Sequence, residues 1–85
     1  MKAKVTGVEP RTSHKGGMFY HVFFKGEDDK SYLTHAYPLF KNKPMRNFKL
    51  WGEVIKRFKD GQDVYVDDLK IYKGTLLDAD SGRLC

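Results

Sequence analysis

The residues best suited to binding chemistry lie in one short stretch, MFYHVFFK, at positions 18 to 25. It concentrates four aromatic side chains and a histidine within eight residues of an 85-residue chain. A β-strand sends neighbouring side chains to opposite faces, so one small core can bury only every second ring. The remaining rings are expected on the surface, where they are costly unless something covers them.

A second ring-bearing stretch, KSYLTHAY at 30 to 37, follows the turn residues GEDD, and the two stretches predict a β-hairpin. If residues 26 to 29 form the turn, Lys25 pairs with Lys30 and Phe23 faces Tyr32. On the other face of the hairpin, Val22 then pairs with Leu33. Because both of these are aliphatic, that face is predicted to be the core.

This register leaves rings and polar side chains together on the outward face: Phe19, Phe23, Tyr32, His21, Lys25 and Lys30. A shift of one residue would swap the faces, burying Phe19 and Phe23 and exposing Tyr20 and Phe24. Both registers leave a surplus of rings. Aromatic platforms flanked by lysines are typical of sequence-tolerant single-strand binding, because bases stack on the rings and cations follow the phosphates.

The composition indicates a single globular domain over residues 1 to 85, with 40% hydrophobic and 32% charged residues. Sixteen Lys and Arg against eleven Asp and Glu give a net charge of +5, which favours a polyanionic partner. The single cysteine, Cys85, excludes an intramolecular disulfide and favours a cytoplasmic location. We expect no membrane association, because no apolar run approaches the ~18 residues of a membrane span and the N-terminus lacks a signal-peptide pattern.

Other chemistry finds little support in the sequence. His14, His21 and His35 lack metal-ligand spacing and have no cysteines beside them, and the assumed register puts the last two on opposite faces. The Gly16-Gly17 pair lacks the lysine and hydroxyl spacing of a phosphate loop. No nucleophile, base and orienting group converge. We therefore expect no catalytic residues, no metal and no cofactor, and a protein that is not an enzyme.

The remaining elements follow from periodicity and turn chemistry. KAKVTGV at 2 to 8 predicts a first strand, because Ala3, Val5 and Gly7 alternate with Lys2, Lys4 and Thr6. EPRTSHKGG at 9 to 17 predicts a basic loop. The segment 38 to 47 predicts an irregular crossing. Asn47 is a candidate N-cap for an amphipathic helix that Gly61 ends. The buried stripe expected for this helix is Phe48, Trp51, Ile55 and Phe58.

Two further strands are expected after the helix. Val64 and Val66 mark the fourth strand, and the change of parity at Leu69 and Ile71 predicts a bulge or tight turn at Asp67-Asp68. TLLDA at 75 to 79 is the fifth strand. Residues 80 to 85 are expected as a loose tail.

This order of three strands, a helix and two strands resembles the small single-stranded-DNA-binding proteins of the oligonucleotide/oligosaccharide-binding (OB) fold. The resemblance runs from Lys2 to about Asp80 and rests on the element order, the aromatic strands and the closing KIYKGTLLDADS. It implies a mostly β, five-stranded OB barrel with one helix between strands 3 and 4. In that family the ligand also contacts the loops joining strands 1 to 2 and 4 to 5. By position, the resemblance adds Arg11, Lys15, Lys70, Tyr72 and Lys73 to the interface.

The expected function is non-enzymatic binding of single-stranded nucleic acid in replication or recombination, with DNA favoured over RNA by the resemblance alone. The tail DSGRLC is short and includes Arg83, unlike the long acidic tails of many bacterial single-strand binders. This favours a virus- or plasmid-encoded protein in a bacterial or virus-infected host cell. Replication proteins and a second copy of the chain are further expected partners. The alternatives are an RNA-binding OB domain and a protein-interaction or self-associating module that uses the same aromatic surface.

Overall fold

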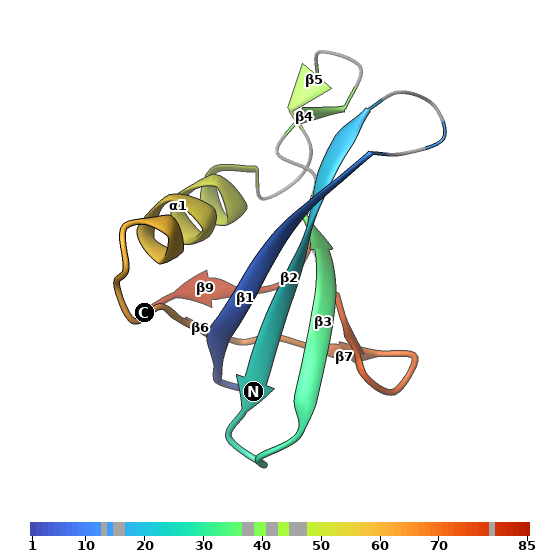
Figure 1. Cartoon of the computed structure of the whole chain (residues 1–85). Coiled ribbons are helices and arrows are strands. Elements are labelled where there is room, and N and C mark those ends of the chain that lie inside the picture. The colour runs from blue at the N-terminus through green and yellow to red at the C-terminus, as the bar shows by residue number, and fades with distance from the viewer. Residues whose placement is uncertain (13, 15–16, 37–38, 41–42, 45–47, 79) are drawn as a thin grey trace.

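The chain folds into a mostly β structure with one helix after the third strand in the part described (Figure 1). The computed structural model describes residues 1–12, 14, 17–36, 39–40, 43–44, 48–78 and 80–85. The elements, in chain order, are β1 (Ala3–Thr12), β2 (Met18–Gly26), β3 (Ser31–Ala36), β4 (Leu39–Phe40), β5 (Lys43–Pro44), α1 (Phe48–Lys59), β6 (Tyr65–Asp67), β7 (Ile71–Tyr72), β8 (Leu76–Leu77) and β9 (Arg83–Leu84).

Seven strands form one mixed sheet in the order β7-β8-β3-β2-β1-β6-β9, and β4 pairs with β5 in the predicted crossing. The β3–β8 pair is parallel and the other pairs are antiparallel. Asp67 and Ile71, in strands near opposite ends of this order, are only four residues apart, a span of at most about 14 Å. The sheet must therefore curl. No ladder joins β6 to β7 among the described residues, so the sheet is not closed into a barrel.

The hydrophobic core fills the inner face of the curled sheet and is capped by α1. Phe24 meets Trp51 of the helix edge to face, with ring centroids 6.0 Å apart. The buried hydrophobic side chains are Ala3, Val5, Val22, Phe24, Tyr32, Ala36, Trp51, Val54, Ile55, Val64, Val66, Leu69 and Leu77. The radius of gyration, 12.0 Å, matches the ~12 Å expected for a compact domain of this length.

The helix follows the predicted stripe at Trp51, Ile55 and Phe58, and the side chain of Phe48 lies outside the described part of the chain. Trp51 and Ile55 are buried, Phe58 is half-buried against the core, and Val54 adds a fully buried position. Gly61 adopts a φ of 81° just past the helix, which confirms the predicted left-handed cap. The expected N-cap, Asn47, lies outside the described residues. No described helix has the length and apolarity needed to cross a membrane.

The predicted register of the β2–β3 hairpin is wrong by one residue. Lys25 pairs with Ser31, so Phe24 faces Tyr32 and Phe23 faces Leu33. The turn takes three residues rather than four, because Asp29 adopts a left-handed φ of 64° and the Gly26 amide donates to the Lys30 carbonyl at 2.9 Å. The inner face of β2 is as predicted, with Val22 and Phe24 buried, but the faces of β3 are exchanged.

Tyr32 is the predicted surface residue whose position this correction changes. Its side chain belongs to the core, at 4% exposure, and not to the outward platform. Its hydroxyl donates to the Asp28 carboxylate at 2.5 Å, and the Lys30 amide donates to the same carboxylate at 3.2 Å. The bond from Tyr32 lowers the pKa of Asp28 and raises the pKa of Tyr32. The aspartate thus ties the turn to the first core residue of β3.

The first strand is longer than predicted, because residues 9 to 12 continue it instead of forming a loop. Pro10 is tolerated since β6 pairs β1 only near Ala3 and Lys4, which leaves β1 an edge strand further along. A bulge between Val5 and Gly7 shifts the alternation. Gly7 therefore shares the outer face with Phe23, contrary to the expected placement beside Ala3 and Val5.

The C-terminal half contains one confirmed prediction and one wrong one. Asp68 has a φ of 61° between the buried Val66 and Leu69, which confirms the tight turn that changes the strand's parity. The tail was expected to be loose, yet Arg83 and Leu84 form β9 and pair with Asp67 and Val66. Leu84 packs against the core. This apolar contact supplies the reason for the added strand.

We predict that Phe24→Ala costs about 3–5 kcal/mol of unfolding free energy, because it empties a site beneath Trp51. Phe23→Ala, its outward neighbour, should cost much less, since its ring is half-exposed. Urea unfolding followed by circular dichroism measures both. If Phe24→Ala fails to fold, Phe24→Leu provides a graded variant that should still be less stable than Phe23→Leu. Equal losses at the two positions would contradict the register.

Candidate nucleic-acid interface

Four rings meet on the outer face of β2 and β3, and we call them the ring face: Phe19, His21, Phe23 and His35. The two histidines are stacked, with centroids 4.8 Å apart and planes 14° from parallel. Phe19 lies 5.3 Å from His21 and 5.7 Å from His35, and Phe23 meets His21 edge to face at 6.2 Å. All four side chains are half-buried. They form one continuous surface on the side of the sheet away from the core.

Strand pairing extends the ring face sideways. Phe23 pairs with Gly7 on β1 and Leu33 on β3, and Leu33 pairs with Leu76 of β8. Leu76 pairs in turn with Tyr72 of β7, whose side chain is 53% exposed. Paired residues point to the same side of a sheet. An apolar row with an exposed tyrosine at its end therefore borders the ring face.

Cations lie around the ring face rather than within it. Arg11 pairs with Phe19 across β1 and β2, and its guanidinium forms an ion pair with Glu9 at 2.6 Å. Lys73, in the β7–β8 turn, places its ammonium over Tyr72 at 5.4 Å from the ring centroid. Lys25 forms an ion pair with Asp29 at 3.6 Å. The border of the surface thus carries positive charge, and each of these cations contacts an exposed neighbour.

The structure brings most of the predicted interface residues into this region. Phe19, His21 and Phe23 form the ring face, with Arg11 beside it. Lys25 lies further along β2, and Lys30 is exposed at the hairpin turn. Tyr72 and Lys73 lie at the lateral border of the surface, where β7 pairs with β8, and Lys70 is exposed just before β7. Lys15 lies outside the described residues, and Tyr32 is excluded by its burial.

His35 and Leu33 were missed because the assumed register put them on the inner face. The signal was present in the spacing: a three-residue turn pairs His21 with His35 and separates Tyr32 from the outward set. The two histidines share one face, contrary to the prediction. Among the described residues, no group of three or more His, Cys, Asp and Glu side chains is arranged to hold a metal ion.

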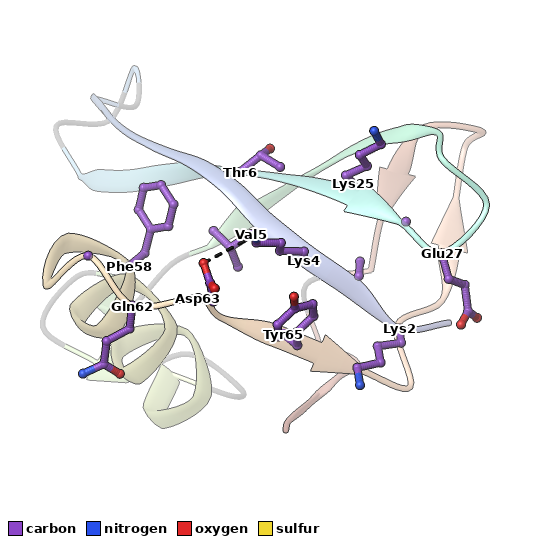
Figure 2. A pocket seen from close by; sticks show the side chains of 13 residues that line it. Lys2, Lys4, Val5, Thr6, Lys25, Glu27, Phe58, Gln62, Asp63 and Tyr65 are labelled. Atoms are coloured by element: carbon purple, nitrogen blue, oxygen red, sulfur yellow. Dashed lines mark ion pairs between the residues drawn. The ribbon is translucent and has the colours of Figure 1, made fainter.

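Two hollows adjoin this surface. The smaller, of about 390 Å³, is lined by Phe23, Gly7, Glu9 and Thr6 among others. The larger, of about 700 Å³, lies between the start of β1, β6 and the end of α1, and we call it the Tyr65 groove (Figure 2). Its charged and aromatic lining consists of Lys2, Lys4, Lys25, Glu27, Phe58, Asp63 and Tyr65. Thr6 lines both hollows, so they border each other at the β1 bulge.

Comparison of the chain with protein-family models, with curated proteins and with solved structures gave no match. Only the residues of the surface itself therefore indicate a function.

His21 makes folding stability depend on pH. Partial burial, with the neighbouring charges of His35 and then Arg11, lowers the pKa of His21 from its ordinary 6.5, while Glu9 opposes the shift. The unfolded chain therefore takes up a proton at a higher pH than the folded chain. Stability due to His21 is complete above about pH 6.5 and is lost as the pH falls below it.

We predict that the unfolding free energy of the wild type falls more steeply between pH 7 and pH 5 than that of His21→Gln. Urea unfolding across this range measures the difference. His35→Gln, which removes a positive neighbour, should raise the pKa of His21 in an NMR titration. Identical pH dependence in wild type and His21→Gln would show that His21 carries no such linkage.

Proposed function

We propose that this protein binds single-stranded nucleic acid, with the bases stacked on the ring face and the phosphates neutralised by the cations around it. The observation that carries the proposal is the set of four contacting rings on the outward side of β2 and β3. None of them is needed to fill the core, which Val22 and Phe24 of the same strand occupy. Stacking requires only a π-face, so the surface accepts any base.

The charge distribution supports the same ligand. Arg11 lies at one end of the ring face, Lys25 at the other, and Lys73 beside Tyr72 at the lateral border. A strand whose bases lie on the rings would place its phosphates within reach of these side chains. The bases of a duplex are paired and stacked internally, so double-stranded DNA should bind more weakly.

We assign the sheet to a partly open OB barrel. In this assignment β6 and β7 are two halves of one bent fourth strand, interrupted at Asp68, and β8 is the fifth strand. The order β1-β2-β3, the helix before β6 and the parallel β3–β8 pair support it. The ring face then occupies strands 2 and 3, the usual ligand surface of this fold.

The ligand class is DNA rather than RNA on the resemblance to single-stranded-DNA-binding proteins alone, and the role is coating of exposed strands in replication or recombination. A rival function is association with a protein or a second copy. It is favoured by β7, a two-residue edge strand on which Ile71 and Tyr72 are 50% and 53% exposed.

We predict that Phe23→Ala weakens binding to an oligothymidylate by about 1–3 kcal/mol, the usual value of one stacked base, while the variant stays folded. Fluorescence anisotropy measures affinity, and circular dichroism checks folding. In the wild type, ~3–5 phosphate contacts should give a slope of log affinity against log salt of about −2 to −3.5. Arg11→Gln should reduce this slope by about 0.7.

Lys56→Gln is the matched control for charge, because Lys56 is exposed on α1 and outside the proposed surface. It should leave the salt slope unchanged. A competition between DNA and RNA oligomers of equal sequence tests the choice of sugar. Size-exclusion chromatography with and without oligonucleotide tests the rival. Concentration-dependent dimerisation together with salt-independent or absent oligonucleotide binding would replace the proposed function with self-association.

A further inference from the structure

We infer that the Tyr65 groove binds the continuation of the same nucleic-acid strand. The protein then has a second stacking position across β1 from the ring face, on the same outer side of the sheet. This inference rests on the proposed function and extends the binding surface from the ring face to a longer path for the strand.

The groove contains a ring between cations. Tyr65 of β6 is 39% exposed, and the ammonium groups of Lys2 and Lys4 lie 5.3 Å and 5.9 Å from its ring centroid (Figure 2). The ring quadrupole attracts both ammonium groups, and because Tyr65 is 39% exposed, this face of its ring is accessible to a planar partner in their place. A base stacked there takes the place of one ammonium, and the displaced lysine then neutralises the adjoining phosphate.

The register connects this ring to the ring face. Lys4 pairs with Lys25 on β2 and with Tyr65 on β6, so these three side chains form one row on the outer side of the sheet. Lys25 is two residues from Phe23 along β2, about 7 Å on the same face. Thr6, the extra residue of the bulge, lines both the groove and the hollow beside Phe23. A strand can therefore pass from Phe23 over Lys25 to Tyr65 without leaving this surface.

The charge of the groove fits a phosphodiester. Three lysines line it, Lys2, Lys4 and Lys25, against two carboxylates, Asp63 and Glu27. Asp63 forms an exposed ion pair with Lys4 at 3.4 Å, drawn as the dashed line in Figure 2. A phosphate exchanges with an exposed carboxylate at little cost, because such pairs contribute little stability. The volume of about 700 Å³ falls within the range of small-molecule sites and leaves room for a nucleotide.

The test measures affinity against length with oligothymidylates of about 4 to 16 nucleotides, the range of site sizes for one OB fold. Tyr65→Ala should bind the shortest oligomers as the wild type does and the longest about 5- to 150-fold more weakly, the value of one stacked base. Tyr65→Phe should restore the affinity. Lys4→Gln should reduce the salt slope by about 0.7 for long oligomers only, and Lys56→Gln should not change it.

The outcomes separate the two proposals. If Tyr65→Ala binds oligomers of every length as tightly as the wild type does, this inference is wrong. The proposed binding at the ring face is not affected by that result. Equal loss at all lengths also overturns it, because Tyr65 would then act within the first site. Competition of thymidine monophosphate with long oligomers, abolished by Tyr65→Ala at unchanged affinity for short ones, supports it. Absence of binding at every length in the wild type overturns the proposed function itself.

Discussion

The three-residue turn between β2 and β3 is the constraint on which the rest of the structure depends. Asp29 takes a left-handed conformation there, and the Asp28 carboxylate accepts bonds from Tyr32 and from the Lys30 amide. Gly26 is required at the start of this turn, since a Cβ would lie 2.5 Å from Asp28 Oδ1 and 2.8 Å from Tyr32 Cε2. One residue more or fewer would exchange every side chain of β3 between the core and the surface. The turn thus decides which rings are available to a ligand.

The sequence predicted best where the signal was local. The helix followed from the spacing of Trp51, Ile55 and Gly61, and the break at Asp68 followed from the parity of Val66 and Leu69. The inner face of β2 was also predicted, because Val22 and Phe24 alternate with outward residues. Each of these depends on neighbours in the chain, where periodicity and turn chemistry act directly.

The site was predicted only in part, because pairing between strands depends on features with weak sequence signals. The alternation along β2 correctly predicts the outward positions of Phe19, His21 and Phe23, but a turn of four residues exchanges Tyr32 with His35. The bulge at Thr6 was missed as well, and with it the outward position of Gly7. Pro10 predicted a loop, because the sequence has no signal that β6 pairs only with the start of β1 and leaves one edge of β1 open at Pro10. The wrong assignments therefore share one cause, the geometry of pairing rather than the type of residue.

The buried Thr34 links the core to the lateral part of the surface. It is the one buried polar side chain in the described part of the chain, and its hydroxyl donates to the Leu77 carbonyl at 3.1 Å. This bond holds β8 against β3, with Leu77 directed inward and Leu76 outward. Leu76 in turn sets the position of Tyr72 on β7. Because adjacent residues of β8 serve opposite faces, the contact that packs the core also fixes the far border of the proposed interface. The core and the proposed interface are thus formed by alternate residues of the same strands, so an outer ring can change while the core beneath it is retained.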